Sequence, residues 1–356
     1  MNGQLLEVHL AAAAFYRQQL DDRPDGWAAQ HLHARGLVEV LSPSPTCWVG
    51  YAPDGWSRLV SHLRRSGYDD RLLVAAGLAS VTNSGYLIDR FRDRLMFAAH
   101  DLDLHTVGFI GRAQSGRLRY LNTPTTEIYS KAKALVGLDR QVERLRAGAV
   151  PVFVEGPMDS VAVSLSGEEW VGVACCGTAL SPEQALMARK YAWTGAVIVG
   201  FDGDLAGRTG ALRSLEVLSD LFDEVLFARL PDRQDPAALY SVDPRQLRAV
   251  LGSARPLVDF AIEVELERWD KVLDHLSGQV NAVRAVAPLV ASLPPTRVAG
   301  EIAKLAQAVH LDEQLVSTEV VAAVSRCRDR RPRSRRRPST GVVDAGADPA
   351  DYSRSP

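Results

Sequence analysis

The chain has 356 residues, of which 46% are hydrophobic and 24% are charged, and its formal net charge is −2. This length and mixture exclude a single small module and a chain that is disordered over most of its length. No stretch approaches the roughly 20 apolar residues that a membrane helix needs, and no charged-then-apolar signal segment opens the sequence. We therefore expect a cytoplasmic protein with two or three hydrophobic cores and no membrane partner.

The first 145 residues are predicted to form an α+β domain. Apolar residues at helical spacing indicate a helix over 1–22, and a short strand within 48–56 runs into a Pro-Asp-Gly turn. Segments of strand length, apolar or alternating with polar residues, indicate a hairpin over 94–99 and 106–110. Further helices are expected at 27–36, 57–66 and 69–77.

From residue 149 on, apolar strand patterns alternate with helix patterns, which is typical of a mostly parallel sheet covered by helices. We therefore predict an α/β fold with its parallel-sheet domain at 146–250, followed by a helical subdomain at 251–325. The predicted strands are 150–155, 171–176, 196–202 and 224–230, and the predicted helices are 158–165, 182–193 and 205–219.

The last segment, 326–356, is predicted to be a disordered tail because it is rich in Pro, Ser, Arg and Gly. Eight arginines lie within 326–337. We expect this segment to be solvated and to have a non-specific affinity for nucleic acid that fades as salt is added.

The four cysteines argue against a zinc site and against disulfide bonds. They are Cys47, Cys175, Cys176 and Cys327, and no CxxC spacing occurs. Adjacent cysteines do not readily bridge each other, and a zinc ribbon needs paired cysteines at short spacing. The sequence therefore predicts reduced thiols and no bound zinc.

Acidic residues follow two of the predicted strands. Glu155 closes the first strand, with Asp159 four residues later, and Asp202 and Asp204 close the third. Because the carboxyl ends of parallel strands share one edge of a sheet, these carboxylates can meet there. Crowded carboxylates repel unless a cation neutralises them, and an all-oxygen set selects Mg²⁺ or Mn²⁺ over Zn²⁺. The pattern predicts a metal site for phosphoryl chemistry.

Each acidic residue taken alone has a plainer explanation, because an acidic residue after a strand often caps the next helix or lies in a solvated turn. An EF-hand is excluded, since Ala206 and Arg213 stand where its loop needs ligands. The lack of a GxGxxG after the first strand and of a P-loop argues against dinucleotide and Walker-type sites. The pairing of a strand-EGxxD with a later strand-DGD is more specific than either part.

These two motifs resemble the Toprim domain of DnaG-type bacterial DNA primases. The Toprim-like segments are EGPMD (155–159), CGTA (176–179) and DGDLAGR (202–208). Upstream segments resemble the primase RNA-polymerase domain in order and spacing, and the likeness covers residues 8–310. These upstream segments are FYRQQL (15–20), VGYAPDGW (49–56), DRFRDRLMF (89–97), VGFIGR (107–112) and RYLNTPTTEIYSKAKALVGL (119–138).

The resemblance implies a DNA primase, a nucleotidyltransferase that synthesises short RNA primers on single-stranded DNA from nucleoside triphosphates. It implies that Glu155, Asp202 and Asp204 are catalytic and hold Mg²⁺ or Mn²⁺, with Asp159 and Asp235 as further metal ligands. It also implies a basic cleft for nucleotide and template, whose residues here would be Arg112, Arg119, Tyr120, Asn122 and Lys131.

The sequence departs from the family pattern in three places. The cysteines do not supply the family's N-terminal zinc ribbon, so the expected partners include a separate zinc-ribbon protein besides a replicative helicase. Ala237 stands where the second aspartate of an Asp-Pro-Asp motif is usual, which removes an outer carboxylate. The stretch Thr46-Cys47-Trp48 lacks an arginine that the family often has, which removes one cation from the cleft.

Two other functions are compatible with this acidic cluster. A Toprim-type nuclease would use the same metal for hydrolysis, and a catalytically weakened module would only bind nucleic acid. A topoisomerase is excluded, because it needs a tyrosine on a separate gate domain and no segment here is large enough to supply one.

Overall fold

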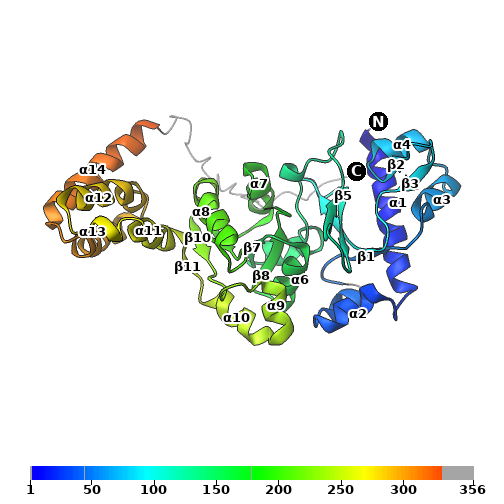
Figure 1. The fold of residues 1–356 in the computed structure, drawn as a ribbon, viewed down its shortest axis with the longest axis horizontal. Coiled ribbons are helices and arrows are strands. Elements are labelled where there is room, and N and C mark those ends of the chain that lie inside the picture. Colours follow the sequence, from blue (N-terminus) through cyan, green and yellow to red (C-terminus); the bar gives the residue numbers. More distant parts are fainter. Residues whose placement is uncertain (1, 44, 178, 331–356) are drawn as a thin grey trace, which may run out of the picture. The chain divides into compact units, whose positions relative to one another are not determined.

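The computed structural model describes residues 2–43, 45–177 and 179–330, and the chain divides into two units, 1–263 and 264–356 (Figure 1). The predicted boundaries at 145 and 250 both lie inside the first unit and stay predictions. Within the described residues no helix combines the length and the apolar character that a membrane span needs.

The N-terminal part of the first unit is built from a long helix and an antiparallel sheet. Helix α1 (Asn2–Asp21) buries Leu5 and Tyr16 against β1 and β5. The sheet has the order β1-β4-β5-β6, and β4 and β5 form the predicted hairpin. The strands are β1 (Gly50–Ala52), β4 (Arg94–His100), β5 (Thr106–Ala113) and β6 (Tyr120–Asn122), and a separate pair is β2 (Ala79–Val81) with β3 (Leu87–Asp89).

The short helix α3 is attached to the β2–β3 pair through specific hydrogen bonds. The buried carboxylate of Asp89 accepts from the amides of Leu59 and Val60 at 2.8 and 2.9 Å, which fixes the start of α3 on β3. The helices expected at 27–36, 57–66 and 69–77 are confirmed as α2, α3 and α4, as α1 confirms the one expected at 1–22. The helices are α2 (Trp27–Ala34), η1 (Val38–Leu41), α3 (Arg58–Arg65), α4 (Asp70–Ala75), η2 (Lys131–Lys133), η3 (Asp139–Gln141) and α5 (Val142–Arg146).

The rest of the first unit is the predicted α/β core. Its sheet has the order β11-β10-β9-β7-β8, in which β10, β9, β7 and β8 run parallel and β11 is antiparallel to β10. Apolar strand residues such as Val152 and Phe153 are fully buried because helices α6 and α8 pack on the sheet. The elements are β7 (Val150–Val154), α6 (Pro157–Ser166), β8 (Trp170–Ala174), α7 (Pro182–Tyr191), β9 (Ala196–Val199), α8 (Leu205–Ser219), β10 (Glu224–Phe227), α9 (Pro236–Val242), α10 (Pro244–Gly252) and β11 (Arg255–Pro256).

The parallel strands end earlier than the sequence pattern predicts. Strand β9 stops at Val199, and beyond it the amide of Gly203 donates to the carbonyl of Gln234 rather than to a sheet neighbour. Likewise β7 stops at Val154. As a result Glu155 and Asp202 lie in the turns just beyond two neighbouring strands.

The second unit begins within α11 (Leu257–Glu267) and continues through η4 (Asp270–Val272) into a helical bundle. Its core includes Val286, Val309 and Val316, all fully buried. Helix α14 continues past residue 325, where the disordered tail is predicted to begin, and 331–356 lie outside the described residues. The three bundle helices are α12 (Leu276–Ala291), α13 (Pro295–Val309) and α14 (Glu313–Arg330).

Candidate active site

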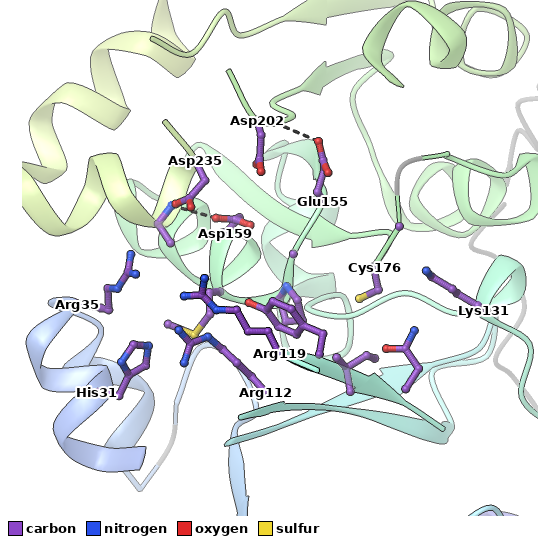
Figure 2. A pocket seen from close by; sticks show the side chains of 18 residues that line it. His31, Arg35, Arg112, Arg119, Lys131, Glu155, Asp159, Cys176, Asp202 and Asp235 are labelled. Carbon is purple, nitrogen blue, oxygen red and sulfur yellow. Dashed lines mark hydrogen bonds between the residues drawn. The ribbon is translucent and has the colours of Figure 1, made fainter. Parts of the chain in front are cut away.

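A pocket of about 430 Å³ lies in the first unit, between the antiparallel sheet and the carboxyl edge of the parallel sheet. Figure 2 shows its acidic side chains on one side and most of its basic side chains on the other. The acidic wall is Glu155, Asp159, Asp202 and Asp235. The basic wall is His31, Arg35, Arg112, Arg119 and Lys131, with Tyr120 and Asn122 beside them.

The acidic wall begins where β7 and β9 end side by side. Glu155 follows β7 directly, and its Oε1 accepts a hydrogen bond from the amide of Asp202 at 3.4 Å. The Oδ1 atom of Asp202 is buried and has no hydrogen-bond partner. Burying a hydrogen-bond acceptor without a donor costs free energy. We therefore expect a positively charged ligand to bind this oxygen.

Asp159 and Asp235 lie at the N-terminal ends of helices α6 and α9. Asp159 lies in the first turn of α6, is 8% exposed, and its Oδ1 accepts from the amide of Ala237 at 3.1 Å. Asp235 caps α9 by accepting from the amide of Ala238. The methyl group of Ala237 lines the pocket at the position that the family pattern gives to an aspartate.

Burial and mutual repulsion raise the pKa values of these carboxyls. Burial, followed by the charges of Glu155, Asp235 and Asp204, raises the pKa of Asp202 to about 7. Burial, followed by repulsion from Asp235 and Asp202, raises the pKa of Asp159 well above its usual range. Burial also raises the pKa of Glu155, against the opposing hydrogen bond from the Asp202 amide. The cluster therefore favours either a proton or a cation.

The donor set fits a hard divalent cation. The carboxylates present oxygen ligands only, and the unpartnered Asp202 Oδ1 is available to one. Among the described residues, no three His, Cys, Asp or Glu side chains are close enough together to hold a metal ion in this conformation. Small side-chain rotations would therefore accompany metal binding.

Asp204 is not brought into the pocket. It is the N-cap of α8, and its side chain accepts from the amide of Gly207 at 2.8 Å. Its charge still contributes to the raised pKa of Asp202. The structure thus gives Asp204 the plain helix-capping role, and a metal-binding role for it stays a prediction.

All five residues predicted for the basic cleft line the pocket. Arg112 on β5 pairs in register with Tyr120 on β6, and its Nη1 atom is buried without a partner. Burial raises the pKa of Tyr120 to about 12, so its hydroxyl stays protonated. The remaining three are Arg119, Asn122 and Lys131.

Three ionisable lining residues are absent from the predicted site: His31, Arg35 and Cys176, of which Cys176 lies in the Toprim-like CGTA segment. His31 and Arg35 come from the end of α2, which the periodicity predicts as a helix without a site role. Their contribution depends on how α2 docks, and a local pattern does not contain that information. Cys176, like Cys47 and Cys175, is a free thiol.

Two family models match adjacent parts of the chain. The one described as the DNA primase catalytic core, N-terminal domain, matches residues 15–142, and the one described as Toprim-like matches residues 152–240. The chain belongs to the DnaG primase family. The primase catalytic core therefore contributes its antiparallel sheet and its Toprim sheet to one pocket.

Known primases resemble this core over most of its length. The DNA primase of Streptomyces coelicolor is 34% identical over 338 residues, which are 92% of this chain and 52% of that protein. The chain therefore spans about half the length of the curated relatives that it matches. The RNA polymerase domain of Mycobacterium tuberculosis primase DnaG, solved with double-stranded DNA, is 32% identical with a TM-score of 0.69, covering 88% of this chain and 99% of that one. A DnaG primase catalytic domain bound to single-stranded DNA is 28% identical with a TM-score of 0.72, covering 88% and 98%.

Proposed function

We propose that this core synthesises short RNA primers on single-stranded DNA by nucleotidyl transfer. The observation that carries the proposal is the single pocket in which a carboxylate wall faces a guanidinium and ammonium wall. Carboxylates suit a divalent cation, and arginines suit phosphates, so the pocket has both halves of a phosphoryl-transfer site. The solved DnaG catalytic domain with bound single-stranded DNA supports DNA as the template class.

Glu155 and Asp202 are the residues that would hold Mg²⁺ or Mn²⁺, with Asp159 and Asp235 beside them. Asp204 lies outside the pocket lining, with its Oδ1 bonded to the Gly207 amide, and would join them by a rotation of its side chain. The bound ion supplies activation of the primer 3′-hydroxyl and neutralisation of charge on the reacting phosphates.

The chain's own residues bind and orient the substrates. Arg112, Arg119 and Lys131 line the pocket and would bind the triphosphate, and Tyr120, which is 38% exposed, would offer its ring for stacking on a template base. The primer 3′-hydroxyl releases its proton to water as its oxygen forms a bond to the α-phosphorus. The bond between the α-phosphorus and the oxygen that bridges to the β-phosphorus breaks, and pyrophosphate leaves. No side chain acts as a nucleophile, so the protein's contribution is orientation and charge.

The test is a primer-synthesis assay on single-stranded DNA with labelled nucleoside triphosphates, with and without Mg²⁺ or Mn²⁺. We expect metal-dependent short RNA, and its loss in Asp202→Ala, with DNA binding retained. The matched control is Glu224→Gln, an exposed carboxylate at the opposite end of the same sheet, which should leave synthesis unchanged. Wild-type activity in Asp202→Ala, or DNA cleavage without RNA synthesis, would overturn the proposal.

The assay also separates initiation from elongation. Extension of a supplied primer without synthesis on a blank template would indicate that initiation requires a zinc-ribbon partner. The other partner class that we propose is a replicative helicase. The template and nucleotides of such an enzyme occur together in the cytoplasm, which is the compartment we propose for it.

A further inference from the structure

His31 brings an unused polar atom to the basic wall. Its Nε2 is buried and has no hydrogen-bond partner, and the residue lines the same pocket as the acidic cluster. Figure 2 shows His31 and Arg35 on the pocket side of α2, on the same side as Arg112. Nothing in the proposed nucleotidyl transfer accounts for this imidazole.

Three arginines line the pocket together with His31. Arg112, Arg35 and Arg119 all act electrostatically on the imidazole, and Arg112 Nη1 is a second buried atom without a partner. Buried donors without acceptors leave hydrogen-bonding capacity unused. The group that would satisfy them together is an anion with several oxygens.

The same arginines keep His31 neutral. Burial, followed by the charges of Arg112, Arg35 and Arg119, lowers the pKa of His31 to about 4. The acidic groups across the pocket, Asp159 from α6 and Asp235 from α9, do not offset this. A neutral imidazole carries one N–H and adds no charge repulsion to a site that already has three guanidinium groups.

Helix α2 is anchored so that His31 is held in place. Asp93 Oδ1 accepts from Trp27 Nε1 at the start of α2 and from the Tyr51 hydroxyl at 2.7 Å. Further along the helix, the side chain of Leu32 is fully buried in the hydrophobic core. A fixed donor loses little entropy on binding a ligand, which favours a binding role over an incidental position.

We propose that His31, Arg35 and Arg112 form a phosphate-binding subsite in which His31 Nε2–H donates to a phosphate oxygen. The ligand class is the phosphate oxygens of a nucleoside triphosphate or of a nucleic-acid backbone. This assignment deepens the proposed function and takes its biological role from it. The binding itself is measurable without primer synthesis.

The test is isothermal titration of inorganic pyrophosphate into the full chain, with a chelator present. His31→Phe, which keeps the ring and removes the donor, should weaken pyrophosphate binding about tenfold, and His31→Gln should restore most of the affinity. His33→Phe is the matched control, because His33 is exposed on the same helix and should bind like wild type.

A parallel titration with a single-stranded DNA oligonucleotide separates the two sources of phosphate. A loss confined to pyrophosphate assigns the subsite to the nucleotide, and a loss confined to the oligonucleotide assigns it to the strand. In NMR spectra, pyrophosphate should raise the pKa of His31 from about 4 toward its ordinary value, which a purely structural role would not cause.

Equal affinities of wild type and His31→Phe for both ligands would overturn the subsite. The outcome for primer synthesis is independent of this one. If wild type makes no primers but His31→Phe still loses phosphate affinity, the subsite stands and the proposed polymerase function falls.

Discussion

The amide of Asp202 donates to Glu155 Oε1 over 3.4 Å, and this bond joins the turns that follow β9 and β7. Gly207 in the first turn of α8 lies against both residues. A Cβ atom there would stand 2.2 Å from the Asp202 carbonyl oxygen and 2.9 Å from Glu155 Oε1. The spacing of the two carboxylates therefore depends on a residue with no side chain.

Gly207→Ala should disturb this arrangement. Overpacking at a fixed backbone contact costs roughly 1–3 kcal/mol, so we expect a lower melting temperature and at least a tenfold loss of primer synthesis. The control is Gly300→Ala within α13, where a Cβ meets nothing within 4 Å and alanine should stabilise the helix by about 1 kcal/mol. Wild-type activity and stability in Gly207→Ala would contradict the close contact.

The raised pKa of Asp202 predicts a pH-dependent stability for the metal-free protein. In the folded chain Asp202 keeps its proton up to about pH 7, whereas the ordinary value is 3.8. The folded state binds more protons in that window, so this contribution to stability is full below about pH 4 and is lost as the pH rises through about 7.

Asp202→Asn does not ionise and escapes this loss. With a chelator present, we expect the variant to melt above wild type at about pH 8, and the difference to shrink as the pH falls to about 4. The measurement is thermal unfolding across pH, with Glu224→Gln as the control. A constant difference at every pH would show that Asp202 is not the titrating group.

Local patterns predicted most of the fold, because helical spacing and the alternation of strand and helix segments depend on residues that are close together in the sequence. They placed Glu155 and Asp202 at adjacent strand ends. They misjudged the strand lengths, since the turn after Val199 is fixed by a hydrogen bond from Gly203 to Gln234, far along the chain.

The site was predicted less completely for the same reason. The pattern of two aspartates around a glycine suggests that Asp202 and Asp204 face one point, yet Asp204 turns to cap α8. His31 and Arg35 enter the pocket because Asp93, more than fifty residues away, anchors the start of their helix. No spacing within α2 carries that information.

The Asp93 anchor leads to its own prediction. Asp93→Ala leaves the Trp27 N–H and the Tyr51 hydroxyl without their acceptor, and unsatisfied buried donors cost about 1–3 kcal/mol. We expect a lower melting temperature together with weaker pyrophosphate binding, because α2 carries His31. Asp93→Asn retains an acceptor oxygen and should lie closer to wild type.

The control for this change is Asp54→Ala, whose exposed carboxylate accepts a hydrogen bond from the neighbouring Gly55 amide at 2.8 Å. It should leave both melting temperature and pyrophosphate affinity close to wild type. Normal pyrophosphate affinity in a destabilised Asp93→Ala would mean that the anchor stabilises the fold without positioning His31.

Asp204 allows a capping role and a metal-binding role to be separated in one residue. Asparagine caps a helix about as well as aspartate, so Asp204→Asn should keep the bond from the Gly207 amide and the stability of wild type. Asparagine lacks the charge that a divalent cation requires. If Asp204 rotates to the metal during catalysis, Asp204→Asn should lose primer synthesis by about 100-fold.

Asp204→Ala completes the comparison, because it should lose that activity and also about 1 kcal/mol of stability with the cap. Thermal unfolding and primer synthesis, measured on both variants, give a separate result for each role. Full activity in Asp204→Asn would leave Asp204 as a helix cap alone and would restrict the metal ligands to the four carboxylates that line the pocket.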